Sequence, residues 1–244
     1  QLTPLHVQEF AENLYKEGLT DTTIRIYLTL IKVILNYASK MNYVTYHIHP
    51  FVLFKMPECN IRDLDLSVDE LKSIRDTMFL KSSLSITRDI FMLTYYLGGI
   101  NLKDLLEYNF KDKDYIRYVR HKTRNRKKGI NEIAFSLQPE AKEILNRYLT
   151  KEGELRFGKY LSYKQVYSLI FRNINKVAEM SGIKKKVTYY SARKTFAHNL
   201  GIQIEKIEYC IGHSMKSNRP IFNYIKIMQE HADKVFREIL DQLL

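Results

Sequence analysis

Apolar residues recur along most of this chain at the spacing of an α-helix. Between Thr22 and Ala38 they follow one face of a helix whose N-cap is Thr20, and a shorter helix before it ends at Gly18. Capping boxes that start at Ser67 and Ser162 mark two further helix beginnings. The same reasoning predicts helices over residues 86–97, 102–108, 139–149, 163–180, 191–200, 203–211 and 222–243.

One region alternates at period two instead. Residues 115–123 and 130–137 flank the basic turn "RNRKKG", which predicts a β-hairpin with its glycine at Gly129. Arg120 and Lys122 lie two residues apart in the first strand, so we expect them to point to the same face. The expected fold class is therefore mainly α with a small antiparallel β-sheet (α+β).

A segment without periodicity divides the chain. Residues 49–67 contain two prolines and read as a linker, which predicts a small helical domain at 1–57 and a larger domain at 58–244. Two helices make a thin core. We therefore expect the first domain to lean on something else or to have lost earlier helices.

The charge is unevenly distributed. The chain has 39 Lys and Arg against 27 Asp and Glu, a formal net charge of +12, and nearly all of the excess lies after residue 57. It is concentrated in the tyrosine-containing runs 111–128 and 184–194. Either run alone could be a solvated surface, but together they favour a polyanionic partner such as DNA. A membrane surface is the weaker alternative.

Other classes of protein find little support. No apolar run is long enough to cross a membrane, the first residues lack an export signal, and the two cysteines suggest neither a disulfide framework nor a zinc site. His47 and His49 lack a third metal ligand at useful spacing, and there is no glycine-rich phosphate loop. We expect a cytoplasmic protein that associates with the nucleoid, and we do not expect metal chemistry.

Two basic segments carry candidate chemistry. Lys122 could donate a proton to a leaving alkoxide while Arg120 clamps phosphate oxygens. From this segment alone, however, a basic hairpin that merely touches the DNA backbone is the preferred interpretation. Arg193 is expected in the first turn of a helix, where free amides favour an anion, and Thr195 and Phe196 would bury one side of that helix.

Two later residues are ambiguous by themselves. His213 follows Gly212 at the end of a predicted helix, and Tyr224 follows the break at Arg219-Pro220. A lone histidine is usually structural, and a tyrosine within an apolar run is more often core than catalytic.

In this order, "HKT", "ARKTFA", "IGHS" and the late tyrosine resemble the tyrosine recombinase (phage integrase) family. The resemblance implies a partial SAM-like core-binding domain followed by the family's catalytic domain. It further implies that Tyr224 attacks a scissile DNA phosphate to give a 3′-phosphotyrosyl link, that Lys122 protonates the leaving 5′-oxygen, and that Arg193 and His213 hold the non-bridging oxygens. The implied partners are double-stranded DNA and further copies of the chain, as a homotetramer assembled on DNA.

Three positions depart from the family pattern. Asn101 stands where the family usually has its first arginine, and Arg120, or more weakly Lys103, could supply the missing charge; some Bacteroides-type integrases also lack this arginine. Tyr190 stands where a histidine is usual, and it could still donate one hydrogen bond to a phosphate. Phe222 occupies the commoner nucleophile spacing, so Tyr224 requires a longer connection after His213.

Two rival functions stay open. The departures could mark a DNA-binding protein of the same fold that has lost catalysis, and the same chemistry without synapsis would give a type IB topoisomerase-like activity. The apolar stripe that begins at Ala232 and ends at Leu243 could pack within its own chain. The family suggests instead that this stripe docks onto a neighbouring protomer.

Overall fold

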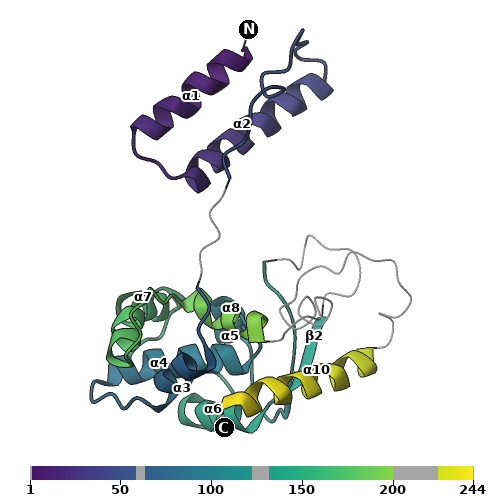
Figure 1. The fold of residues 1–244 in the computed structure, drawn as a ribbon. Helices are drawn as coiled ribbons and strands as arrows, with labels where there is room; N and C mark the ends of the chain where they lie inside the picture. The colour runs from purple at the N-terminus through teal and green to yellow at the C-terminus, as the bar shows by residue number, and fades with distance from the viewer. Residues whose placement is uncertain (1, 59–63, 123–131, 200–224, 244) are drawn as a thin grey trace. The chain divides into compact units, whose positions relative to one another are not determined.

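The chain forms two compact units, Gln1–Asp63 and Leu64–Leu244, in a computed structural model that describes residues 2–58, 64–122, 132–199 and 225–243 (Figure 1). For residues 225–231 only the backbone is described. The division falls slightly later in the chain than the predicted boundary after residue 57. That these units are a core-binding and a catalytic domain stays a prediction.

The first unit is a pair of helices with a small core. Helix α1 (Pro4–Lys16) is followed by Gly18, whose φ of +78° suits the turn into α2 (Asp21–Lys40). The predicted N-cap of α2, Thr20, is confirmed. Phe51, from the predicted linker, joins the core, which consists of Val7, Ala11, Leu14, Ile24, Leu28, Leu35 and Phe51.

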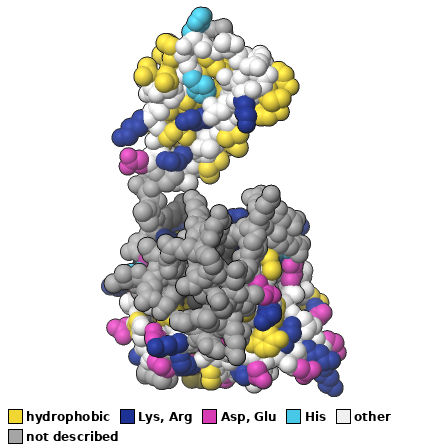
Figure 2. All heavy atoms as spheres, turned by 90° about the vertical axis from the view of Figure 1, so that its right-hand side faces the viewer, with side chains coloured by type: hydrophobic (Ala, Val, Ile, Leu, Met, Phe, Trp, Pro, Cys, Tyr) yellow, Lys and Arg dark blue, Asp and Glu magenta, His cyan; other side chains and the backbone are white. Residues whose placement is uncertain are grey.

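A second side of α2 is apolar and exposed. Ile26, Leu30, Val33, Ile34 and Tyr37 are all more than half exposed. Figure 2 shows hydrophobic side chains spread over the surface of this unit. The core of the first unit is therefore thin, as its residue pattern predicts.

The second unit is built around α4 (Ser82–Tyr96). This helix packs against α3 (Val68–Asp76), α6 (Pro139–Tyr148), α7 (Tyr163–Met180) and α8 (Tyr189–Asn199), and eleven of its residues are buried. A helix that is apolar on almost every side belongs in the middle of a domain. The short helix α5 (Leu102–Glu107) follows α4 after a glycine turn.

Local signals place most helix boundaries correctly. Both capping boxes are present: Ser67 exchanges hydrogen bonds with Glu70, and Ser162 does so with Gln165. Helix α7 matches its predicted range, whereas α8 begins two residues earlier than expected. The predicted helix at 203–211 lies outside the described residues.

The sheet is one antiparallel pair, β1 (Tyr115–Val119) and β2 (Glu132–Ser136), in which Ile116 lies opposite Phe135. The predicted fold class is confirmed by this sheet and the surrounding helices. The expectation that Arg120 and Lys122 share a strand face is wrong, because β1 ends at Val119 and the alternation stops there. Arg120 is buried, while Lys122 is exposed in a turn.

The C-terminal helix α10 (Ile225–Leu240) and the following 3₁₀ turn η2 (Asp241–Leu243) pack onto their own chain. Asp233 accepts hydrogen bonds from the backbone N–H and the hydroxyl of Ser136, both at 2.6 Å. Phe236 stacks on Phe135 with ring centroids 4.3 Å apart. All members of the predicted apolar stripe are buried in this core: Ala232, Val235, Phe236, Ile239, Leu240 and Leu243.

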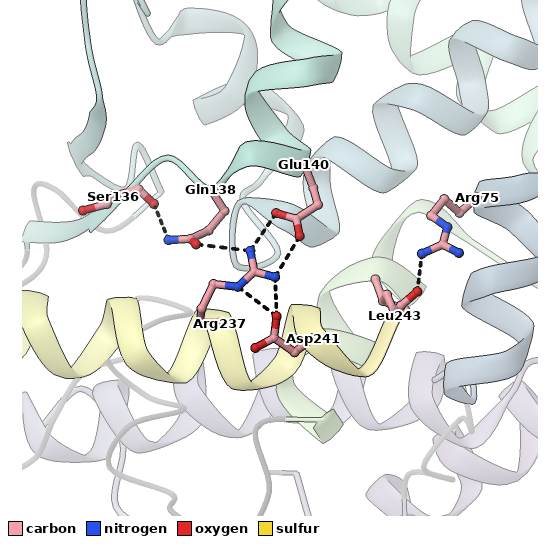
Figure 3. A network of polar contacts seen from close by, with 7 residues as sticks. All are labelled: Arg75, Ser136, Gln138, Glu140, Arg237, Asp241 and Leu243. Carbon is pink, nitrogen blue, oxygen red and sulfur yellow. Dashed lines mark hydrogen bonds and ion pairs between the residues drawn. The ribbon is translucent and has the colours of Figure 1, made fainter.

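The structure supports the alternative interpretation, packing within the chain, because these side chains fill the core of their own unit. Docking of the stripe onto a neighbouring protomer stays a prediction. Polar contacts add to the packing. Arg237 lies between Glu140 of α6 and Asp241 of η2, and Arg75 of α3 donates to the backbone carbonyl of Leu243 (Figure 3). Within the described ranges, no helix has the length and apolarity needed to span a bilayer.

Candidate active site

Arg193 lies on the buried side of α8. Its side chain is 4% exposed, and Ser191, Thr195 and Phe196 around it are fully buried. Because α8 begins at Tyr189, Arg193 lies one turn inside the helix, not beside its first free amides as the sequence suggested. Packing therefore fixes Arg193 in place, as predicted from Thr195 and Phe196.

Gly99 brings the backbone unusually close to Arg193. Arg193 Nη1 donates to the Gly99 carbonyl at 2.7 Å. A Cβ atom added to Gly99 would lie 2.7 Å from Arg193 Cγ and 2.8 Å from its Cα, and the φ of Gly99 is +72°. Only glycine combines this conformation with this approach. Sequence reasoning missed Gly99, although the "GG" pair just before Asn101 was a visible signal.

A second buried guanidinium lies near Arg193. Arg120 is 9% exposed, and its charge, after burial itself, lowers the pKa of Arg193. The oxygens of Tyr118, Tyr190 and Asp104 act on that pKa in the opposite direction. Two buried like charges repel each other, so a bound anion would stabilise both. Arg120 and Arg193 come from segments more than seventy residues apart, and the fold brings them together.

Asp104 connects α5 to the segment that holds Arg120. One carboxylate oxygen accepts the backbone N–H of His121 at 2.8 Å, and the other lies 3.3 Å from Asn101 Nδ2. Asn101 itself is the N-cap residue of α5. Asp104 thus orients the backbone between Arg120 and Lys122, and its place three residues after Asn101 was visible in "GINLKD".

The remaining predicted residues divide into two groups. Tyr190 is 49% exposed, lies one helical turn before Arg193, and is near enough to affect its pKa. Lys122 is exposed in the turn after β1, next to His121, whose Nε2 lies 2.8 Å from Lys103 Nζ. His213 and Tyr224 lie outside the described residues.

Helix α7 presents a further feature that sequence reasoning did not single out. Tyr163, Tyr167 and Phe171 recur every four residues, are exposed, and stack on one another with centroid distances of 6.1 and 6.3 Å. Lys164 and Arg172 are exposed beside them. Between Leu155 and Ala178 the sequence contains no Asp or Glu. This basic and aromatic face suits a polyanion.

Among the described residues, no three His, Cys, Asp or Glu side chains lie close enough together to hold a metal ion. A cleft of about 410 Å³ lies elsewhere in the second unit. Its walls hold several oppositely charged pairs, including Arg88 with Asp89 and Arg147 with Asp89. In this cleft the charges of arginines and carboxylates largely compensate one another.

Comparison with known proteins gives a consistent result. No protein-family model matches the chain. A tyrosine recombinase from Pseudothermotoga lettingae (strain ATCC BAA-301 / DSM 14385 / NBRC 107922 / TMO) is 24% identical over 242 residues, which are 95% of this chain and 80% of that protein. The tyrosine recombinase XerC of Syntrophus aciditrophicus (strain SB) is 24% identical over 178 residues, 66% of this chain and 56% of that protein. The chain thus spans little more than half of this second relative.

Solved structures share the fold. A lambda integrase dimer bound to a COC′ core site superposes with a TM-score of 0.63 at 17% identity, over 96% of this chain and 80% of that one. A lambda integrase tetramer bound to a Holliday junction gives a TM-score of 0.63 at 17% identity, over 89% of this chain and 63% of that one. The predicted resemblance to the tyrosine recombinase and integrase family is confirmed by these relatives and this fold.

Proposed function

We propose that this chain is a site-specific DNA recombinase that breaks and rejoins DNA through a covalent tyrosyl intermediate. The observation that carries the proposal is the pair of buried arginines, Arg120 and Arg193, held close enough for one to lower the pKa of the other. A buried cluster with excess positive charge suits the negatively charged phosphodiester of a DNA strand. The relatives, all recombinases or integrases, support this class of reaction.

In the proposed reaction Tyr224 attacks the scissile phosphate, forming a phosphotyrosyl bond as the bond to the 5′-oxygen breaks. Lys122 gives that oxygen its proton, and Arg193 and His213 hold the non-bridging oxygens. Reversal with a 5′-hydroxyl from another strand reseals the DNA, so neither a metal nor a nucleotide is consumed. A preorganised cation of this kind is typically worth on the order of 10²–10³ in rate.

Arg120 takes the role of the family's first arginine in this proposal. Asn101 has a neutral amide that already contacts Asp104, so it cannot supply a guanidinium. Asp104 also binds the backbone N–H of His121, the residue after Arg120, which connects the start of α5 to the segment that carries Arg120. Tyr190 can offer one hydroxyl donor near Arg193, where the family usually has a histidine.

DNA is the proposed partner and further copies of the chain complete the assembly. The solved lambda integrase complexes are a dimer on a core site and a tetramer on a Holliday junction. The basic and aromatic face of α7 is a candidate contact for the DNA backbone and bases. If the chain binds DNA but does not cleave it, the second candidate function applies: a DNA-binding protein of the same fold that has lost catalysis.

A covalent-trapping experiment tests the proposal. The substrates are duplexes of randomised sequence that carry a nick, so that cleavage releases a short fragment. Without the 5′-hydroxyl of this fragment the reaction cannot reverse, and the protein–DNA adduct survives denaturation. We expect an adduct with the natural chain, none with Tyr224→Phe, and a retained adduct with the control Phe222→Leu. DNA binding without any adduct would favour the binding protein, and relaxation of supercoiled plasmid without recombinant products would favour a topoisomerase.

A further inference from the structure

Tyr189, the first residue of α8, joins three segments of the second unit although no catalytic role has been assigned to it. Its ring packs against the core. Its hydroxyl lies 2.7 Å from the hydroxyl of Thr94 in α4 and 3.3 Å from the carbonyl oxygen of Ile100. Burial raises the pKa of Tyr189, so its hydroxyl keeps its proton and can donate.

The available protons decide how these contacts are used. The Thr94 hydroxyl also lies 2.8 Å from the carbonyl oxygen of Ile90. The hydroxyls of Thr94 and Tyr189 have one proton each, so only two of the three contacts can be hydrogen bonds at one time. Ile90 lies in the interior of α4, where its carbonyl already accepts a helical N–H bond. The arrangement in which Thr94 donates to Tyr189, and Tyr189 donates to Ile100, therefore leaves neither carbonyl without a donor.

Ile100 belongs to the same turn as Gly99. Two successive carbonyls of this turn are bound from α8: Gly99 by the guanidinium of Arg193 and Ile100 by the hydroxyl of Tyr189. Tyr189 and Arg193 are four residues apart, so they lie on the same face of the helix. The turn leads directly into Asn101 and α5, whose Asp104 holds the backbone next to Arg120.

We propose that Tyr189 is a positioning residue for the phosphate site. Its hydroxyl holds the turn at Gly99 and Ile100 against α8. That turn then fixes the Arg193 guanidinium and the start of α5. Tyr189 itself need not touch DNA, because its donor is already committed to Ile100. The inference rests on the proposed function, since positioning matters only if Arg193 acts on a phosphate.

The test is Tyr189→Phe, which removes one oxygen and keeps the ring. We expect adduct formation to slow about 10-fold, the effect of one buried hydrogen bond, with unchanged DNA affinity. Hydrogen exchange at the backbone amides of residues 98–104 should become faster. The matched control is Tyr148→Phe. In the natural chain the Tyr148 hydroxyl of α6 donates to the buried Asp89 of α4 at 2.7 Å, so this variant also loses one hydrogen bond to a buried group.

Tyr148→Phe should lower the melting temperature without changing the cleavage rate of folded protein. The same pattern in Tyr189→Phe would reduce Tyr189 to a structural residue and overturn the inference. In an Arg193→Lys background, Tyr189→Phe should slow cleavage little further, because it acts through the arginine; fully additive losses would also overturn it.

Failure of the proposed function has a different signature. If the natural chain forms no adduct on any duplex, the recombinase proposal fails, and the exchange measurement alone decides whether Tyr189 holds the turn. Unchanged exchange at residues 98–104 in Tyr189→Phe then rejects the inference, whereas faster exchange confined to those residues supports only the part of it in which Tyr189 holds the turn.

Discussion

Arg193 and Arg237 lie in the same unit but in opposite electrostatic surroundings. Arg237 of α10 donates to both carboxylate oxygens of Glu140, at 2.9 and 3.0 Å, and also to Asp241, and these bonds raise its pKa. Arg193 of α8 donates to the neutral carbonyl of Gly99, while burial and the charge of Arg120 lower its pKa.

The difference separates a structural arginine from one suited to binding. A guanidinium between two carboxylates has its charge compensated and holds the C-terminal helix to α6. Near Arg193 two buried guanidiniums stand against one buried carboxylate, that of Asp104, so an excess of positive charge remains that suits an anionic ligand. The comparison predicts that changes at the two arginines affect different measurements.

The largest effect is expected at Arg193. Arg193→Met removes the cation and keeps much of the side-chain volume, so adduct formation should fall by on the order of 10²–10³. The midpoint of urea unfolding should change little, because the variant removes a desolvated charge but also the hydrogen bond to the Gly99 carbonyl. Unfolding at clearly lower urea would show that Arg193 serves structure instead.

A smaller loss is expected at Arg120. Arg120→Gln should slow adduct formation about 10- to 100-fold, measured by single-turnover trapping, because the site loses one of its two buried guanidiniums. Adding Asn101→Arg to this variant restores the charge from α5 and should recover part of the rate. Wild-type cleavage by Arg120→Gln alone would remove Arg120 from the site.

At Arg237 the expected effect is on stability. Arg237→Met should lower the free energy of unfolding by about 1–2 kcal/mol, because the carboxylates of Glu140 and Asp241 lose their common donor. Chemical denaturation would measure this loss. The rate of adduct formation by the protein that remains folded should not change, and a loss of rate with intact stability would contradict the division between the two arginines.

The smallest effect concerns the pairing of Arg75 with Asp76, another compensated arginine. The hydrogen-bonded guanidinium of Arg75 lowers the pKa of Asp76 below its ordinary value of 3.8. The pair therefore contributes stability above pH 4, and this contribution is lost as the pH falls through the lowered pKa. Asp76 is mostly exposed, so the contribution is about 0.3 kcal/mol. In Asp76→Asn, the free energy of unfolding should therefore depend less on pH below about pH 4, which denaturation at a series of pH values would measure.

Much of the helical architecture could be predicted from the sequence. The capping boxes at Ser67 and Ser162 and the range of α7 depend on residues within a turn or two of each other, so local chemistry decides them. The residue types of the candidate site could be found in the same way: Lys122, Arg193, His213 and Tyr224 appear in a characteristic order. The roles of His213 and Tyr224 stay predictions.

Local patterns do not reveal which distant residues meet. Period-two reasoning placed Arg120 beside Lys122 on one strand face, whereas β1 ends at Val119 and Arg120 turns inward. The stripe on α10 looked equally suited to a neighbouring protomer, because an apolar face does not specify its partner. The core formed by Phe135, Phe196 and Phe236 shows that it packs within its own chain.

Most helices, the excess of positive charge and the chemical groups available for a phosphate follow from the sequence alone. That Arg120 lies near Arg193, that Gly99 makes room for that arginine, and that Tyr189 binds the adjacent carbonyl became visible only in the folded unit. The two kinds of information differ in range. Helix periodicity and capping act over a few residues, whereas two buried guanidiniums come close only when the packing of the whole unit holds distant segments together.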